Sequence, residues 1–70
     1  MEYFKVVVPG RERQDINVFV NTMRNGKTGQ VLTLEAGYVL VSVDLPDAEE
    51  KVVDLWDTTP ANPKVIEIRV

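Results

Sequence analysis

The residues of this chain that could do chemistry are its arginines, lysines and carboxylates, because it contains neither histidine nor cysteine. Without histidine, the usual general base near neutral pH and the commonest metal ligand are both missing. Without cysteine there is no thiol nucleophile, no thiolate zinc site and no disulfide. No set of nucleophile, base and orienting group can be assembled from what remains. We therefore predict a non-enzymatic protein with no catalytic residue, no metal site and no cofactor.

A candidate ligand site lies in the loop after the first apolar run, where Pro9-Gly10 predicts a turn and two arginines follow. A guanidinium holds a carboxylate or phosphate through two parallel hydrogen bonds. The N-terminus of a following helix would add free N–H groups for the same anion. Gly10, Arg11 and Arg13 are thus the candidate ligand-binding residues of a small-ligand or anion-sensing domain. In the alternative, the loop is solvated and its arginines pair with neighbouring carboxylates.

Two further patterns look like known sites in composition only. Gly26-Lys27-Thr28 resembles the end of a phosphate-binding P-loop, but Asn21 stands where that loop needs a glycine, and a predicted helix precedes the motif. The carboxylates between Asp44 and Asp57 lack the spacing of a calcium-binding loop. We interpret the first pattern as a helix end with a turn, and the second as a helix cap followed by a solvated helix face.

A first helix is predicted to follow the arginine loop. Ile16, Phe19, Val20 and Met23 fall at the i, i+3, i+4 and i+7 positions of one helix face, and the following Asn-Gly pair is typical of a helix end. Val18 interrupts the polar side of this helix, and a strand over the sequence INVFV is the alternative.

A second helix is predicted to begin at Asp47, which is a suitable N-cap with Glu50 three positions later. Its apolar stripe consists of Val52, Leu55 and Trp56, and Trp56 is expected to anchor it in the core. The two prolines that follow, at positions 60 and 63, end the helix.

Four strands are predicted from runs rich in β-branched and aromatic residues. The first spans residues 3–8, the last spans residues 64–70, and residues 31–34 and 38–43 form a hairpin around Gly37. Gly37 is expected to supply the positive φ of a short hairpin loop. Alternation gives the hairpin one apolar face, formed by Leu32, Leu34, Val39, Val41 and Val43.

The predicted order is strand, helix, strand, strand, helix, strand, which the ferredoxin-like βαββαβ plait satisfies. The expected fold class is α+β, a four-stranded antiparallel sheet with both helices on one face. We expect residues 1–70 to form one small domain. The predicted core consists of Phe4, Val6, Val8, Ile16, Phe19, Val20, Met23, Leu32, Leu34, Val39, Val41, Val43, Val52, Leu55, Trp56, Ile66 and Ile68.

The sheet face opposite the helices would stay open and carry apolar side chains. Its candidate interface residues are Tyr3, Lys5, Val7, Val31, Tyr38, Leu40 and Val65. An apolar patch with a charged rim is typical of a protein interface, and symmetric pairing of two copies is the simplest way to cover it. The leading prediction is a protein-interaction or regulatory module that forms a homodimer through this face.

Charge and hydropathy limit the remaining partners. Eight basic and eleven acidic residues give a formal net charge of −3, which disfavours nucleic acid, where lysine and arginine supply the affinity. Tyr3 and Tyr38 could stack on bases, so single-stranded nucleic-acid binding is kept as the weakest alternative. No run approaches the roughly 20 apolar residues of a membrane span, and the first residues lack the pattern of a signal peptide. We expect a cytoplasmic protein with no membrane partner.

Overall fold

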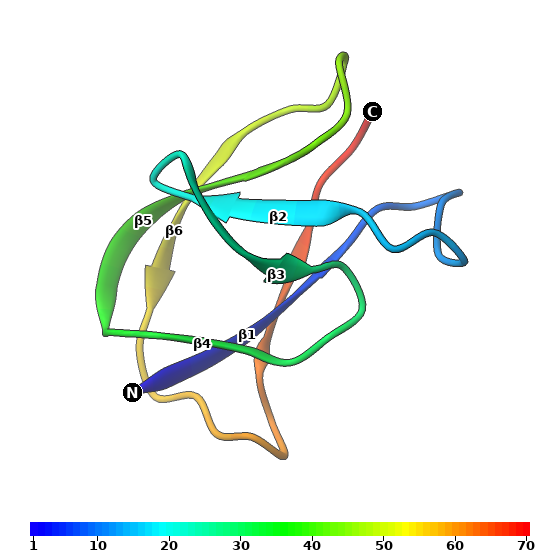
Figure 1. Cartoon of the computed structure of the whole chain (residues 1–70). Coiled ribbons are helices and arrows are strands. Elements are labelled where there is room, and N and C mark those ends of the chain that lie inside the picture. Colours follow the sequence, from blue (N-terminus) through cyan, green and yellow to red (C-terminus); the bar gives the residue numbers. More distant parts are fainter.

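The computed structural model describes every residue from Met1 to Val70, and the chain forms seven strands and no helix (Figure 1). The strands are β1 (Glu2–Val7), β2 (Asn17–Val20), β3 (Met23–Lys27), β4 (Leu32–Leu34), β5 (Gly37–Val43), β6 (Lys51–Leu55) and β7 (Lys64–Glu67). The chain contains no helix long and apolar enough to cross a membrane.

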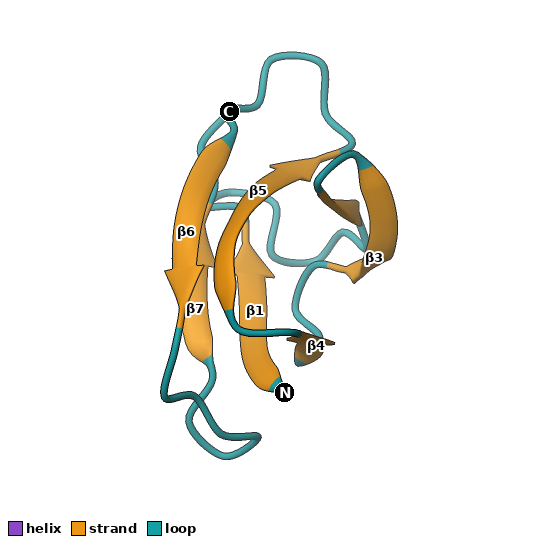
Figure 2. Ribbon diagram, turned by 90° about the vertical axis from the view of Figure 1, so that its left-hand side faces the viewer, coloured by secondary structure: helices purple, strands orange, loops and turns teal.

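The strands form two sheets around a shared interior (Figure 2). The three-stranded sheet has the order β4-β1-β7, and β1 pairs antiparallel with β4 but parallel with β7. The four-stranded sheet has the order β3-β2-β5-β6 and is antiparallel throughout. Each sheet therefore has an inner face toward the other sheet and an outer face toward solvent.

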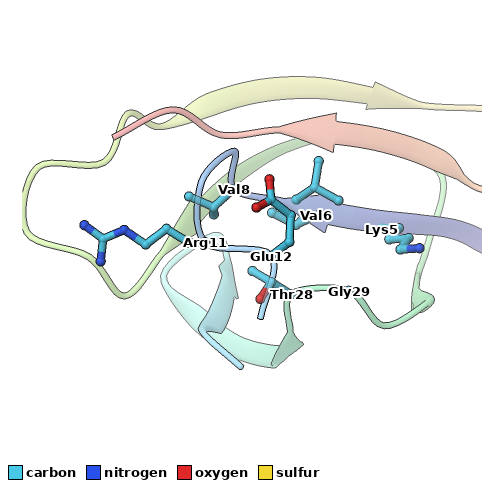
Figure 3. Close-up of a pocket in the computed structure, with 8 residues that line it drawn as sticks. Lys5, Val6, Val8, Arg11, Glu12, Thr28 and Gly29 are labelled. Atoms are coloured by element: carbon cyan, nitrogen blue, oxygen red, sulfur yellow. The ribbon is translucent and has the colours of Figure 1, made fainter. Parts of the chain in front are cut away.

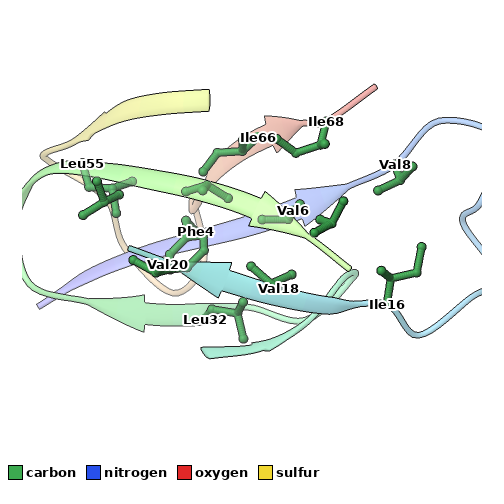
Figure 4. Packing of buried hydrophobic residues seen from close by; sticks show 13 residues of the cluster. Phe4, Val6, Val8, Ile16, Val18, Val20, Leu32, Leu55, Ile66 and Ile68 are labelled. Atoms are coloured by element: carbon green, nitrogen blue, oxygen red, sulfur yellow. The ribbon is translucent and has the colours of Figure 1, made fainter. Parts of the chain in front are cut away.

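A single cluster of 13 buried apolar residues fills the interior (Figure 4). Phe4, Leu55 and Ile68 are the largest side chains that are fully buried. Because neighbouring side chains of a strand point to opposite faces, apolar residues at every second position of β1, β2 and β5 enter this cluster. Its members are Phe4, Val6, Val8, Ile16, Val18, Val20, Leu32, Val39, Val41, Val43, Leu55, Ile66 and Ile68.

The predicted α+β ferredoxin-like plait is wrong, because both of its helices are strands. In the first, Val18 and Val20 point inward and Phe19 points outward, which is the period of two that defines a strand. The alternative of a strand over INVFV is therefore the one the structure adopts. Met23, predicted to be in the core, is 74% exposed.

The second predicted helix is β6, which pairs with β5 from Gly37 opposite Leu55 to Val41 opposite Lys51. A helix of this length is marginal in isolation, whereas the strand gains a full ladder of backbone hydrogen bonds. Adjacent β-branched valines also favour the extended chain. As a consequence Val52 and Trp56, predicted to be buried, are 69% and 57% exposed.

The predicted hairpin of residues 31–34 and 38–43 is wrong in its pairing. Its two strands exist as β4 and β5, but β4 pairs with β1 and β5 pairs with β2 and β6. Gly37 does have a positive φ, 132°, and the predicted apolar face of the two strands does point inward. The turn thus carries the chain around a corner from one sheet to the other.

The true hairpin joins β2 to β3 through Asn21 and Thr22, with φ values of 49° and 71°. Positive φ at both positions is typical of a type I′ turn. Asn21 is tied to β5, because its N–H donates to the carbonyl of Leu40 at 2.8 Å and its Oδ1 accepts from the N–H of Leu40 at 3.0 Å. Thr22 makes no such bond, and its branched Cβ is strained in the left-handed region.

We predict that Thr22→Gly stabilises the protein by about 1 kcal/mol, because glycine adopts this φ without a Cβ clash. Urea unfolding followed by circular dichroism measures the change. Thr33→Gly, at an exposed position in β4, is the matched control and should lose about 0.5–1 kcal/mol. Equal losses in the two variants would show that Thr22 carries no strain.

Candidate functional site

A pocket of about 210 Å³ lies beside β1, at the place where β4 stops pairing with it (Figure 3). The pairing with β4 covers only Glu2, Tyr3 and Phe4. Further along β1, the corner after β3 takes over, and the N–H of Gly29 donates to the carbonyl of Val6 at 3.0 Å. The pocket is lined by Lys5, Val6, Val7, Val8, Arg11, Glu12, Thr28 and Gly29.

The predicted arginine loop closes one side of this pocket. The N–H of Arg11 donates to the carbonyl of Val8 at 3.0 Å, which folds the loop back onto the end of β1. Arg11 lines the pocket, whereas Gly10 and Arg13 do not. No helix follows the loop, so the predicted helix N-terminus does not contribute. The structure thus brings one of the three candidate ligand-binding residues to a pocket.

The carboxylate of Glu12 lies between the side chains of Arg11 and Lys5 in the view of Figure 3, and all three residues line the pocket. Its Oε2 accepts a hydrogen bond from the N–H of Gly10 at 2.9 Å. Bonds from its own backbone N–H, and then from that of Gly10, lower the pKa of Glu12 from its ordinary value of 4.5. The carboxylate is therefore ionised at neutral pH.

None of these three charged groups has a charged partner in the protein. The structure contains two ion pairs, Glu49 with Lys51 and Glu67 with Arg69, and both lie elsewhere. The predicted pairing of the loop arginines with neighbouring carboxylates is thus absent. Lys5, Arg11 and Glu12 are free to interact with charges on another molecule.

Thr28 forms the buried floor of the pocket. Its Oγ1 accepts from the N–H of Ile16 at 3.2 Å and donates to the carbonyl of Gln14 at 3.1 Å. The hydroxyl therefore joins the arginine loop to the end of β3. The segment Gly26-Lys27-Thr28 is not a helix end, as predicted, but the end of β3 and the corner that follows it.

The predicted interface residues divide between the two sheets. Tyr3, Lys5 and Val7 alternate with the buried residues of β1, and Val65 lies opposite Lys5 in β7, so these four share the outer face of the three-stranded sheet. Val31 lies directly before β4. Tyr38 and Leu40 lie on the outer face of the four-stranded sheet instead. The single open face that the prediction required does not exist in this fold.

The apolar surface around Tyr38 and Leu40 is larger than the sequence predicted, because Phe19, Val52 and Trp56 were assigned to the helix cores. On the four-stranded sheet Leu40 lies opposite Val52, and Phe19, opposite Ser42, is diagonal to Leu40. Alternation within the sequence INVFV was the signal that could have found Phe19. We call this surface the outer patch. It consists of Phe19, Tyr38, Leu40, Val52 and Trp56, the last directly after β6.

No protein-family model matches the chain, and comparison with curated proteins and with solved structures gave no match either. The structure holds no group of three or more acidic side chains placed to bind a metal ion.

We predict that Thr28→Val destabilises the protein by about 1–3 kcal/mol, because the buried N–H of Ile16 and the partly buried carbonyl of Gln14 both lose their partner. Urea denaturation measures the loss. Thr33→Val is the control, since Thr33 is exposed and its side chain makes no hydrogen bond in the protein. Its change should stay within about 0.5 kcal/mol. Equal effects in the two variants would contradict a structural role for the Thr28 hydroxyl.

We predict that the Gly10 amide resonance titrates with a midpoint below pH 4.5, because it reports the lowered pKa of Glu12. The bond from Gly10 is complete above pH 4.5 and is lost as the pH falls through the lowered pKa. A proton–nitrogen correlation spectrum recorded across pH measures the midpoint. Glu12→Gln should abolish this titration, and a midpoint at or above 4.5 would argue against the bond.

Proposed function

We propose that this protein is a non-enzymatic interaction module that forms a homodimer through the outer patch of its four-stranded sheet. The observation that carries the proposal is the exposure of large apolar side chains at adjacent positions of paired strands. Tyr38 is 75% exposed, Val52 is 69% exposed and Trp56 is 57% exposed. Leu40 and Phe19 are half-buried among them.

The composition of the outer patch supports a protein partner. Tryptophan, tyrosine and phenylalanine are enriched in protein interfaces, and tryptophan and tyrosine carry much of the binding energy where they become fully desolvated. A contiguous apolar surface is rare on a protein that acts alone. The other outer face is less suitable, because Lys5 and Glu67 stand among its apolar residues.

The charges at the two rims of the outer patch support a second copy as the partner. Arg24 lies at the β3 rim, where its Nε donates to Oδ1 of Asn17 at 3.1 Å. Asp54 lies at the β6 rim, opposite Tyr38. A two-fold axis along the strands would place the basic rim of one copy over the acidic rim of the other. The patch is thus self-complementary in charge as well as apolar.

The size of the protein supports a weak dimer. A stable interface buries about 800 Å² per partner, which is roughly one sixth of the 4579 Å² surface of this chain. The outer patch has five residues, whereas a stable interface takes about 20–30 residues from each partner. We therefore propose association that depends on protein concentration. We propose the cytoplasm as its compartment, since a chain without cysteine has no disulfide that needs an oxidising one.

The arrangement of the tyrosines argues against the nucleic-acid alternative. Tyr3 lies on the three-stranded sheet and Tyr38 on the four-stranded sheet, so they do not form one stacking platform. The net charge of −3 also disfavours a phosphate backbone.

Val52→Lys is expected to abolish the dimer, because association would then have to remove the lysine charge from water at the centre of an apolar patch. Light scattering across a concentration series measures the molar mass, which should rise toward twice 7.9 kDa in the unchanged protein and stay at one chain in the variant.

Val65→Lys is the matched control on the other sheet. Val65 is 62% exposed, similar to Val52 at 69%. The surroundings also match, since an acidic residue lies two positions further along each strand: Asp54 after Val52 and Glu67 after Val65. The control should associate like the unchanged protein. A monomeric control with a dimeric Val52→Lys variant would move the interface to the three-stranded sheet, and a strict monomer at all concentrations would exclude self-association.

A further inference from the structure

The charges around the pocket beside β1 follow a definite order. The guanidinium of Arg11 extends to one side, the carboxylate of Glu12 lies in the middle, and the ammonium of Lys5 extends to the other side (Figure 3). All three lack a charged partner in the protein. A complementary ligand would carry an anion, a cation and a second anion in that order.

The backbone adds a donor at the Arg11 end. The carbonyl of Val7 accepts from the N–H of Ile68 at 2.9 Å, so it points toward β7. In a trans peptide the next N–H points the opposite way, and the N–H of Val8 is therefore directed away from β7. It donates no hydrogen bond within the protein, although Val8 is only 2% exposed and lines the pocket. Buried backbone N–H groups are nearly always paired, so this donor points to a ligand acceptor.

The size of the pocket restricts the ligand. Sites for drug-sized molecules have volumes of about 300–1,000 Å³, and this pocket has about 210 Å³. Of its three apolar residues, Val7 has its side chain at the surface, where it suits a short methylene chain, whereas the side chains of Val6 and Val8 are buried in the core. The ligand is thus a small molecule with a few carbon atoms between its charged groups.

We propose that this pocket binds a free acidic amino acid, with glutamate as the best fit. Its α-carboxylate is held by the Arg11 guanidinium and the Val8 N–H, its ammonium by the Glu12 carboxylate, and its side-chain carboxylate by Lys5. The two negative charges and one positive charge of the ligand match the two positive charges and one negative charge of the pocket. This site does not depend on self-association, since none of its residues belongs to the outer patch.

The test is a titration of the full chain with four related probes, followed by proton–nitrogen correlation spectra. L-glutamate should shift the amide resonances of Val8, Glu12 and Gly29. Glutarate lacks the ammonium, L-glutamine lacks the side-chain charge, and 4-aminobutyrate lacks the α-carboxylate. Each should bind about tenfold more weakly than glutamate or worse, the loss expected for one charge-assisted contact of about 1.4 kcal/mol.

Single variants assign each contact separately. Glu12→Gln should remove the preference for glutamate over glutarate, and Lys5→Gln should remove the preference for glutamate over glutamine. Arg11→Gln should weaken glutamate about tenfold or more. Arg13→Gln is the matched control, because Arg13 lies in the same loop but does not line the pocket, and it should leave all affinities unchanged. The same spectra show that each variant is folded.

Four results would overturn the proposal. Glutarate that binds as tightly as glutamate would exclude the contact between the ammonium and Glu12. Equal binding of glutamine and glutamate would exclude Lys5. Shifts that are absent at millimolar probe, or that persist unchanged in Arg11→Gln, would exclude the pocket as the site.

Discussion

The parallel pairing of β1 with β7 is the interaction on which the rest of the structure depends. It joins the first and last apolar runs of the chain, from Phe4 beside Lys64 to Val7 beside Glu67. Closing so long a loop costs chain entropy, and a chain of 70 residues has a thin core with which to offset it. Side chains also bond the segments next to this pair: Glu49 accepts from the N–H of Arg69, just after β7, and Glu2, at the start of β1, accepts from Thr58 in the loop before β7.

The candidate site follows from unequal strand lengths beside β1. β7 accompanies this strand as far as Val7 and Ile68, whereas β4 leaves it after Phe4. The unpaired stretch is bordered by two loops instead of a strand, and the hydroxyl of Thr28 holds those loops together. A backbone edge thus becomes the wall of a pocket, and side chains from the solvent face of β1 reach its mouth. Binding at this place would use the least regular part of the sheet.

The sequence predicts which residues of β1, β4, β5 and β7 face inward, because apolar residues recur at every second position of these runs. It does not separate helix from strand in the short run from Ile16 to Val20. Ile16 and Val20 face inward both in a helix and in a strand, so only Val18 and Phe19 distinguish the two structures. Which strands pair depends on residues far apart in the sequence. The sequence therefore does not predict which of the two sheets carries each outward-facing residue. For the same reason the sequence predicts Arg11 as a ligand-binding residue, but it does not predict that Lys5 and the Val8 N–H lie at the same pocket.

The parallel pairing of the terminal strands also fixes how the molecule bears load. Because β1 and β7 run in the same direction, the chain enters at one end of this pair and leaves at the other (Figure 1). Tension applied between the two termini would therefore act along the strands. The hydrogen bonds between them would be sheared together instead of opened one at a time. The segment that unfolds first under force can therefore differ from the segment that unfolds first in heat or urea.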